Sequence, residues 1–235
     1  MKIRAIKRGE TSKLISIITA ITSVLTALIV GSLFITILGI NPLEAYMSII
    51  SESLGSFYGV TETLVKTTPL IFCGLGVAIA FRMQLWNIGA EGQLYMGAFG
   101  ATLVALFFKS DSHFVMISLM IISAIFFGGI WGLIPGVFKA FLNVNETIVT
   151  LLMNYIAILW VDFLVYGPWK DPKGFNFPLS KKFPDTAILE NFFDSRLNLS
   201  FFIAILSVIL VYILIEKTVL GYEIKVIGSN PKAAL

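Results

Sequence analysis

N-I-G-A-E-G-Q at residues 87–93 separates two apolar runs, Leu64–Phe81 and Leu94–Phe108. The second run is about 15 residues, or about 22 Å of helix, which is shorter than the hydrocarbon core of about 30 Å. A helix that starts at Ile88, capped by Asn87, would reach about 31 Å but would carry Glu91 and Gln93 towards the membrane interior. We therefore predict a broken or re-entrant helix near residues 84–93. The alternative is an interfacial turn of a helical hairpin.

The composition is that of a membrane protein. Of the 235 residues, 57% are hydrophobic and 13% are charged, and the mean hydropathy is +0.90. This predicts an all-α, polytopic transmembrane helical bundle. Cys73 and His113 are the single cysteine and histidine, so we expect no disulfide framework and no metal or haem site built on them. The net charge of +3 requires no nucleic-acid partner.

Six membrane segments are expected in one transmembrane domain covering residues 1–235. They are Leu14–Leu38, Leu64–Phe81, Ile88–Phe108, Phe114–Phe138, Glu146–Gly167 and Ser200–Ile215. An even number places both termini on one side. Basic residues precede the first segment, and Asn41–Glu62 after it carries acidic residues without Lys or Arg. By the positive-inside rule both termini are predicted to be cytoplasmic, in a multi-pass protein of the plasma or inner membrane.

Other stretches predict how the segments are connected and packed. Leu43–Leu54 is amphipathic and predicts a short helix on the outer surface, whereas the proline-containing stretch Pro168–Leu199 predicts an irregular loop. Small residues recur every four positions in the third and fourth segments, a pattern that favours close helix packing. These are Gly97, Ala101 and Ala105, and Ala124, Gly128, Gly132 and Gly136.

The fifth segment begins with a polar face. Asn145 is placed to cap its start, and Glu146, Thr147, Thr150 and Asn154 fall within an arc of about 100° on a helical wheel. Asn154 lies about 12 Å into the helix, where an amide needs a protein or water partner. Two interpretations stay open: a hydrogen bond that holds two helices together, or a place on a translocation path.

The sequence lacks the motifs of several common enzyme classes. The sequence has no phosphate-binding loop of the form G-x-x-x-x-G-K-[ST], no H-E-x-x-H and no G-x-S-x-G. We therefore expect no catalytic residue and no ATP hydrolysis by this chain. A transporter built from it needs an ion gradient or an energy-supplying partner. An intramembrane enzyme using Glu91 or Asp162 lacks a second carboxylate, nucleophile or ligand set at a matching depth, and polar residues in the third and fifth segments disfavour a structural scaffold.

Three motifs resemble one known family. They are F-R-M-Q-L-W-N-I-G-A-E-G-Q at 81–93, N-E-T-I-V-T-L-L-M-N-Y-I-A at 145–157 and G-Y-E-I-K-V-I-G-S-N-P-K-A-A at 221–234. In order and spacing they are similar to the permease subunits of bacterial ABC importers for branched-chain amino acids, simple sugars and nucleosides. The residues of the first two motifs are most similar to those of the nucleoside-type permeases that work with basic membrane lipoprotein receptors.

The resemblance implies a role for each motif. One set of residues would lie at or near the translocation path: Asn87, Glu91, Gln93, Asn145, Glu146, Thr150 and Asn154. Residues 221–234 would form a coupling helix that seats on the ATPase, with a turn signal at 228–231. Its candidate residues are Gly221, Glu223, Lys225, Gly228, Asn230, Pro231, Ala233 and Ala234.

The resemblance also implies partners. It implies a separate ABC ATPase that binds ATP and Mg, a homologous second permease subunit, an extracytoplasmic substrate-binding lipoprotein and membrane lipid, with no cofactor in this chain. The substrate is expected to be a small polar solute of the nucleoside type. Simple sugars, branched-chain amino acids or an ion-coupled secondary carrier are the alternatives. Because members of the family usually continue with further membrane helices, we expect this sequence to be incomplete at its C-terminus.

Overall fold

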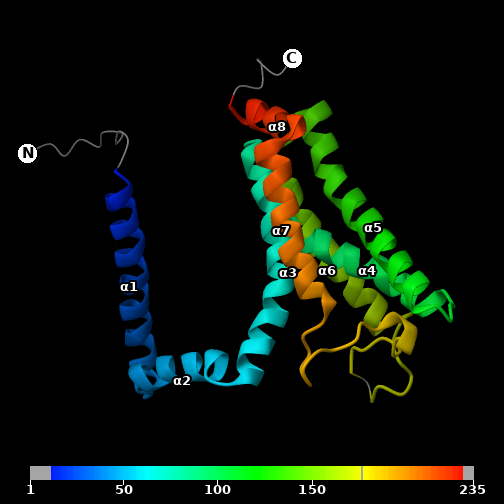
Figure 1. Ribbon diagram of the computed structural model, residues 1–235, viewed down its shortest axis with the longest axis horizontal. Coiled ribbons are helices and arrows are strands. Elements are labelled where there is room, and N and C mark those ends of the chain that lie inside the picture. Colours follow the sequence, from blue (N-terminus) through cyan, green and yellow to red (C-terminus); the bar gives the residue numbers. More distant parts are fainter. Residues whose placement is uncertain (1–11, 176, 230–235) are drawn as a thin grey trace, which may run out of the picture. The chain divides into compact units, whose positions relative to one another are not determined.

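The computed structural model describes residues 12–175 and 177–229. These residues form eight α-helices and one 3₁₀ turn, which confirms the all-α prediction (Figure 1). Five of the helices, α1, α3, α5, α6 and α7, are long and apolar enough to cross a membrane. The elements are α1 (Lys13–Ile37), α2 (Pro42–Leu54), α3 (Phe57–Arg82), α4 (Ala90–Phe107), α5 (His113–Leu142), α6 (Glu146–Tyr166), η1 (Asp185–Ala187), α7 (Leu199–Lys217) and α8 (Val219–Ser229).

The chain divides into two compact units, Met1–Val60 and Thr61–Leu235. In the first unit, Ser12 caps α1, and the hydroxyl of Tyr46 on α2 donates a hydrogen bond of 2.8 Å to the Leu28 carbonyl on α1. The predicted amphipathic helix is α2. It begins one residue earlier than predicted, at Pro42, because the side chain of Asn41 caps it and proline suits the first helical position.

In the second unit, α4 packs against α5 and α6. The small residues bring α4 and α5 close together, as predicted: a Cβ added at Gly97 would lie 3.4 Å from the Ala124 carbonyl oxygen. Further along the same pair, the Ser123 hydroxyl donates a hydrogen bond of 2.8 Å to the Gly100 carbonyl oxygen. The pattern does not extend to Gly136, where a Cβ would have no described atom within 4 Å.

Residues 167–198 are the predicted irregular loop. Apart from η1 they contain only two isolated β-bridges, Lys170 with Ser180 and Asn191 with Asn198, among their described positions. The loop is fixed to the helices by apolar contacts. Trp169 is buried and stacks on Phe99 of α4 with ring centroids 5.4 Å apart, and Ala187 of η1 packs with Ala105 and Met116.

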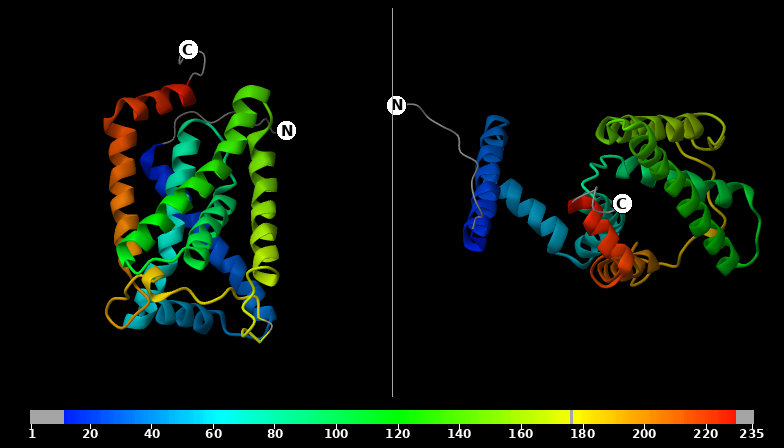
Figure 2. Two further views of the ribbon diagram at one scale, coloured as in Figure 1. Left: turned by 90° about the vertical axis from the view of Figure 1, so that its right-hand side faces the viewer. Right: turned by 90° about the horizontal axis from the view of Figure 1, so that it is seen from above.

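The last two helices meet at a tight corner. Figures 1 and 2 show α8 lying across the end of α7. The Thr218 hydroxyl donates to the Leu214 carbonyl oxygen at 2.6 Å and accepts from the Gly221 amide at 3.2 Å. A Cβ at Gly221 would collide with the carbonyl oxygens of Leu214 and Ile215. The corner therefore requires glycine at this position.

Two predicted boundaries are wrong. The run Leu64–Phe81 is part of the 26-residue α3, because the helix continues through the polar residues that precede the run. The helix expected from Ile88 begins at Ala90 and has 18 residues, about 27 Å. This helix, α4, is not one of the five helices that are long and apolar enough to cross a membrane. Its first turn carries the polar residues Glu91 and Gln93, which lower its hydropathy. Its passage through the membrane stays a prediction.

Candidate functional site

The break predicted near residues 84–93 lies between α3 and α4. Gln84 follows the end of α3 with φ of 60°, a left-handed conformation that turns the chain. Residues 85–89 have no regular structure, and α4 begins partway along the neighbouring helices rather than at the end where α3 stops (Figure 1). The structure therefore confirms a broken helix at the predicted place.

Asn154 of α6 holds the beginning of α4 with both atoms of its amide. Its Oδ1 accepts a hydrogen bond of 2.7 Å from the Gly92 amide, and its Nδ2 donates one of 2.8 Å to the Ile88 carbonyl oxygen. Asn154 is only 8% exposed. It lies about two helical turns from the start of α6, so α4 begins well inside the bundle. The hydrogen-bonding role that the sequence left open for Asn154 is present.

Thr150, one turn earlier on α6, contacts the same segment. Its hydroxyl accepts a hydrogen bond of 3.2 Å from the Ile88 amide and donates to the Glu146 carbonyl oxygen at 2.8 Å. Backbone groups outside regular structure at this depth need such partners, because lipid supplies none. The two side chains satisfy three backbone groups at the break.

Glycine allows this close approach. A Cβ at Gly89 would lie 2.9 Å from the Thr150 Cβ, and one at Gly92 would lie 2.7 Å from the Asn154 Oδ1. Both distances are below ordinary van der Waals contact. Gly89, not Asn87, is the N-cap of α4 and makes no side-chain cap bond. The predicted cap is therefore wrong: the Asn87 Oδ1 accepts a hydrogen bond of 2.8 Å from the Gly89 amide and stabilises the turn before the helix.

Gln93 lies on the other side of the first turn of α4, towards α5. A Cβ at Gly132 of α5 would lie 3.2 Å from the Gln93 Nε2, and the same nitrogen lies 3.5 Å from the Asn87 Oδ1. Gly132 therefore makes room for a polar side chain as well as for helix packing. Asn87, Gln93, Thr150 and Asn154 are brought together at the break.

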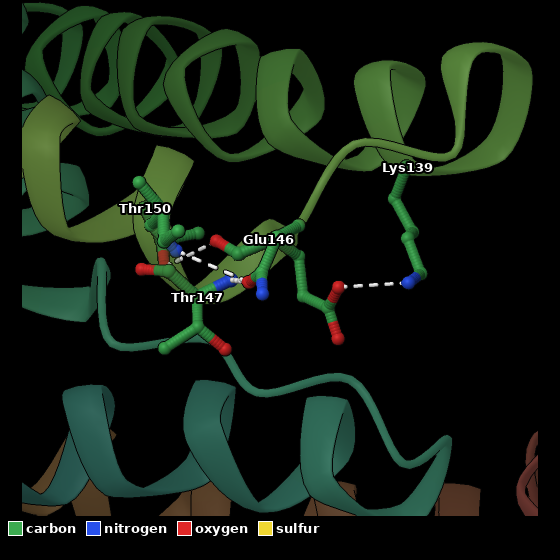
Figure 3. A network of polar contacts seen from close by, with 6 residues as sticks. Lys139, Glu146, Thr147 and Thr150 are labelled. Atoms are coloured by element: carbon green, nitrogen blue, oxygen red, sulfur yellow. Dashed lines mark hydrogen bonds and ion pairs between the residues drawn. The ribbon is translucent and has the colours of Figure 1, made fainter.

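Glu146 and Asn145 lie at the start of α6, and the Glu146 carboxylate also contacts the break, because it accepts a hydrogen bond from the backbone amide of Trp86. The Glu146 carboxylate pairs with Lys139 of α5 at 2.9 Å and is mostly buried, with 15% of its side chain exposed (Figure 3). Asn145 is the predicted cap: its Oδ1 accepts from the amides of Thr147 and Ile148 at 3.0 and 3.4 Å. Both residues contribute to the turn between α5 and α6, and Lys139 is a partner that the sequence pattern did not reveal.

Glu91 is exposed and makes no hydrogen bond or ion pair within the described part of the chain. Its position in the first turn of α4 is electrostatically favourable, because the helix dipole is positive there. Since all other polar candidates at the break have protein partners, Glu91 is the one whose carboxylate is available to a ligand or to another subunit.

The candidate coupling residues are divided between two faces of α8. Gly221 and Gly228 face this chain, since a Cβ at Gly228 would collide with the Arg82 carbonyl oxygen at the end of α3. The Lys225 Nζ lies 2.6 Å from Glu216 of α7, and Glu223 is exposed. The predicted turn is wrong at Gly228 and Ser229, which are helical. Asn230, Pro231, Ala233 and Ala234 lie outside the described residues.

The chain belongs to a family of transport proteins. Residues 59–235 match the family described as branched-chain amino acid transport system / permease component. The resemblance noted in the sequence is thereby confirmed, and with five apolar helices the chain is a multi-pass membrane protein. No solved structure gives a significant match to the chain.

Three curated relatives are similar over most of this chain. The glucose ABC transporter permease protein TsgB13 of Haloferax volcanii is 36% identical over 92% of this chain and 59% of its own length. The guanosine ABC transporter permease protein NupP of Bacillus subtilis is 32% identical over 94% and 64%. The nucleoside ABC transporter permease protein NupB of Lactococcus lactis is 29% identical over 93% and 62%. The chain thus spans about three fifths of the length of these relatives.

Proposed function

We propose that this chain is part of the membrane-spanning permease of an ATP-driven importer that carries a nucleoside into the cell. The observation that carries the proposal is the match of residues 59–235 to the permease family. Two of the three relatives described above are named for guanosine or nucleosides. The polar, glycine-dependent contact between α4 and α6 fits a permease, because irregular backbone at membrane depth occurs where it is sheltered by protein or water.

Glucose, or another simple sugar, is the second candidate substrate. TsgB13, which is named for glucose, is more identical to this chain than either nucleoside relative. Both solute classes carry several hydroxyl groups, so the free carboxylate of Glu91 suits either of them. Branched-chain amino acids are named in the description of the family but not in the names of the three relatives, and an ion-coupled carrier is named in neither.

The proposed assembly contains further subunits. ATP and Mg are held by a separate ATPase, this chain pairs with a second permease subunit, and an extracytoplasmic lipoprotein delivers the solute. In this arrangement α8 lies on the cytoplasmic side and presents the face with Glu223 to the ATPase. The loop 167–198 lies on the outside.

Solute uptake tests the proposal. Cells that express the complete native system are given labelled guanosine, adenosine, glucose or leucine, with and without ionophores that collapse the proton and sodium gradients while ATP is preserved. We expect nucleoside uptake that survives the ionophores and disappears when the gene is deleted. Uptake of glucose alone would move the assignment to the sugar class, and loss of uptake with the gradients would indicate a secondary carrier.

Glu91 is our first candidate for the translocation path because its carboxylate is free within the described chain. Glu91→Gln keeps the size of the side chain and removes its charge. We expect uptake to fall by about tenfold with little change in the amount of protein in the membrane, since an exposed first-turn charge contributes about 1 kcal/mol or less to helix stability. Unchanged uptake would mean that Glu91 contributes only to the start of α4 and not to solute transport.

A further inference from the structure

The inner ends of α3 and α7 are joined by α8 and are poorly packed against each other. A surface groove of about 190 Å³ lies between the two helices near this end. It is lined by Leu75 and Ile79 of α3 and by Val208 and Tyr212 of α7, among others. The groove is open at the surface of the described chain, where Tyr212 is 60% exposed, and α3 and α7 are not among the helix pairs in close contact. The side-by-side contact between these helices is therefore weak in the described chain.

At one end α8 is fixed rigidly to α7. The corner at Thr218 and Gly221 is closed by side-chain and backbone hydrogen bonds, including 3.1 Å from the Tyr222 amide to the Thr218 carbonyl oxygen. Lys225, two turns further along α8, pairs with Glu216 of α7 at 2.6 Å. These contacts prevent α8 from swinging freely about the corner.

At its other end α8 rests on the last turn of α3. Gly228 packs directly on the Arg82 carbonyl oxygen, and a Cβ there would also lie 3.3 Å from the Met83 Cα. Glu216 takes part in this contact as well, since its Oε1 lies 3.9 Å from the Arg82 Nη1. Glycine at residue 228 is therefore what allows α8 to reach α3.

The chain leads from this contact directly to the break before α4. Residues 83–88 follow Arg82, and a six-residue segment spans at most about 20 Å. At its near end the amides of Met83 and Gln84 bond to the last turn of α3, each at 3.0 Å. At its far end Ile88 bonds to Thr150 and Asn154 of α6. The end of α3 and the first turn of α4 are therefore joined by a short segment that is hydrogen-bonded at both of its ends.

We propose that Gly228 is a positioning residue that fixes α8 to the end of α3, so that movement of α8 is passed through residues 83–88 to the α4–α6 contact. The inference rests on the proposed function, in which α8 meets the ATPase. It adds the place where that movement enters this chain: the backbone at Arg82 and Met83, rather than the gap between α3 and α7.

The test compares two glycine substitutions in the complete native assembly. Gly228→Ala inserts a methyl group against the Arg82 carbonyl oxygen, whereas Gly76→Ala in α3 has no described atom within 4 Å of its new Cβ. Hydrogen exchange followed by mass spectrometry reports on the peptide that covers residues 83–92. We expect about tenfold faster exchange in this peptide for Gly228→Ala, including the Ile88 amide that bonds to Thr150, and a change of less than about twofold for Gly76→Ala.

Coupling provides a second readout that a loss of folded protein would not change. We expect Gly228→Ala to keep the ATPase in the purified assembly but to lower the solute transported per ATP hydrolysed by about tenfold. Should Gly228→Ala fail to assemble, Glu216→Gln weakens the ionic contacts of α7 with Arg82 of α3 and with Lys225 of α8 without a clash, and is expected to speed exchange at residues 83–92 by about threefold.

The outcomes separate this inference from the proposed function. Exchange at residues 83–92 equal to that of the wild type, with exchange in α8 itself increased, would overturn the inference while leaving an importer. Absence of any ATPase from the wild-type assembly would overturn the proposed function, and the exchange measurement would still decide whether Gly228 fixes α8 to α3.

Discussion

At the scale of single residues, the break before α4 depends on one amide side chain. Asn154 supplies an acceptor to Gly92 and a donor to Ile88, and both of its own polar atoms are used. An aliphatic residue of similar size would leave two backbone groups unpaired in a buried place. Each such group costs about 1–3 kcal/mol when no water reaches it.

Asn154→Leu is therefore expected to destabilise the protein clearly. The apparent midpoint of thermal unfolding in detergent should fall by about 5 °C or more, because about 2 kcal/mol corresponds to several degrees for a chain of this size. The midpoint can be followed by tryptophan fluorescence. Asn191→Ala, in the exposed outer loop, is the control and should leave the midpoint unchanged. Equal midpoints for the two variants would mean that water replaces the lost partners.

Gly92→Ala tests the close approach from the other side of the contact. The new methyl group would lie 2.7 Å from the Asn154 Oδ1 and 2.9 Å from its Cα. Overpacking of this kind costs about 1–3 kcal/mol. Gly74→Ala, in α3, is the matched control because its Cβ has no described neighbour within 4 Å. We expect the yield of folded protein to fall for Gly92→Ala and to be maintained for Gly74→Ala. Comparable yields for the two variants would show that α6 shifts to accommodate the added methyl group.

At the scale of elements, the outer loop is attached by Trp169. This side chain stacks on Phe99 and contacts Phe107, with ring centroids 5.4 and 6.0 Å apart. Since aromatic side chains bury large areas, they dominate the energetics of such attachments. Elsewhere in the loop Ala187 and Leu197 are also buried, whereas Phe175 is 91% exposed.

Trp169→Ala is expected to release the loop. Removal of a buried tryptophan costs about 3–5 kcal/mol, enough to open a locally attached segment. Limited trypsin digestion should then cut at Lys173, Lys181 or Lys182 at least about tenfold faster than in the wild type. Phe175→Ala removes an aromatic ring of the same loop without removing a buried contact, and digestion should proceed at the wild-type rate. A Trp169→Ala protein as resistant as the wild type would locate the anchor at η1 instead.

The elements show what the sequence could and could not predict. Apolar runs located the long helices well, because burial in lipid depends on local residues, and Asn145 caps α6 as predicted. The caps were less reliable, since the cap of α2 by Asn41 was not predicted and Asn87 does not cap α4. The exact start of α4 was wrong, because Thr150 and Asn154 hold Ile88 in a non-helical conformation from another helix. Long-range partners such as Lys139 with Glu146, or Gly228 with Arg82, depend on the tertiary fold and leave no local pattern.

At the scale of the whole molecule, the sidedness of the protein is a prediction that follows from charge. The basic residues before α1 place the N-terminus in the cytoplasm by the positive-inside rule. In our proposal α8 lies on that side and the loop 167–198 on the other. Two exposed aromatic residues, Tyr222 of α8 and Phe175 of the loop, give access to the two sides.

Cysteine labelling can determine this orientation. In a Cys73→Ala background, Phe175→Cys should react with a membrane-impermeant maleimide added to intact cells, and Tyr222→Cys should react only after the membrane is permeabilised. The unsubstituted Cys73→Ala protein is the control for background labelling. The reverse pattern would invert the proposed topology and would place α8 where no cytoplasmic ATPase can reach it.

The anchoring of the outer loop has a consequence for how a soluble receptor is received. Trp169 and η1 join that loop to α4 and α5, whereas the proposed relay acts on the opposite ends of α3 and α7. A receptor that docks on residues 167–198 would thus keep a constant alignment with the α4–α5 pair throughout a transport cycle. Solute would then be delivered onto a surface fixed to the later turns of α4, so movement that the proposed relay passes to the first turn of α4 would also reach this surface.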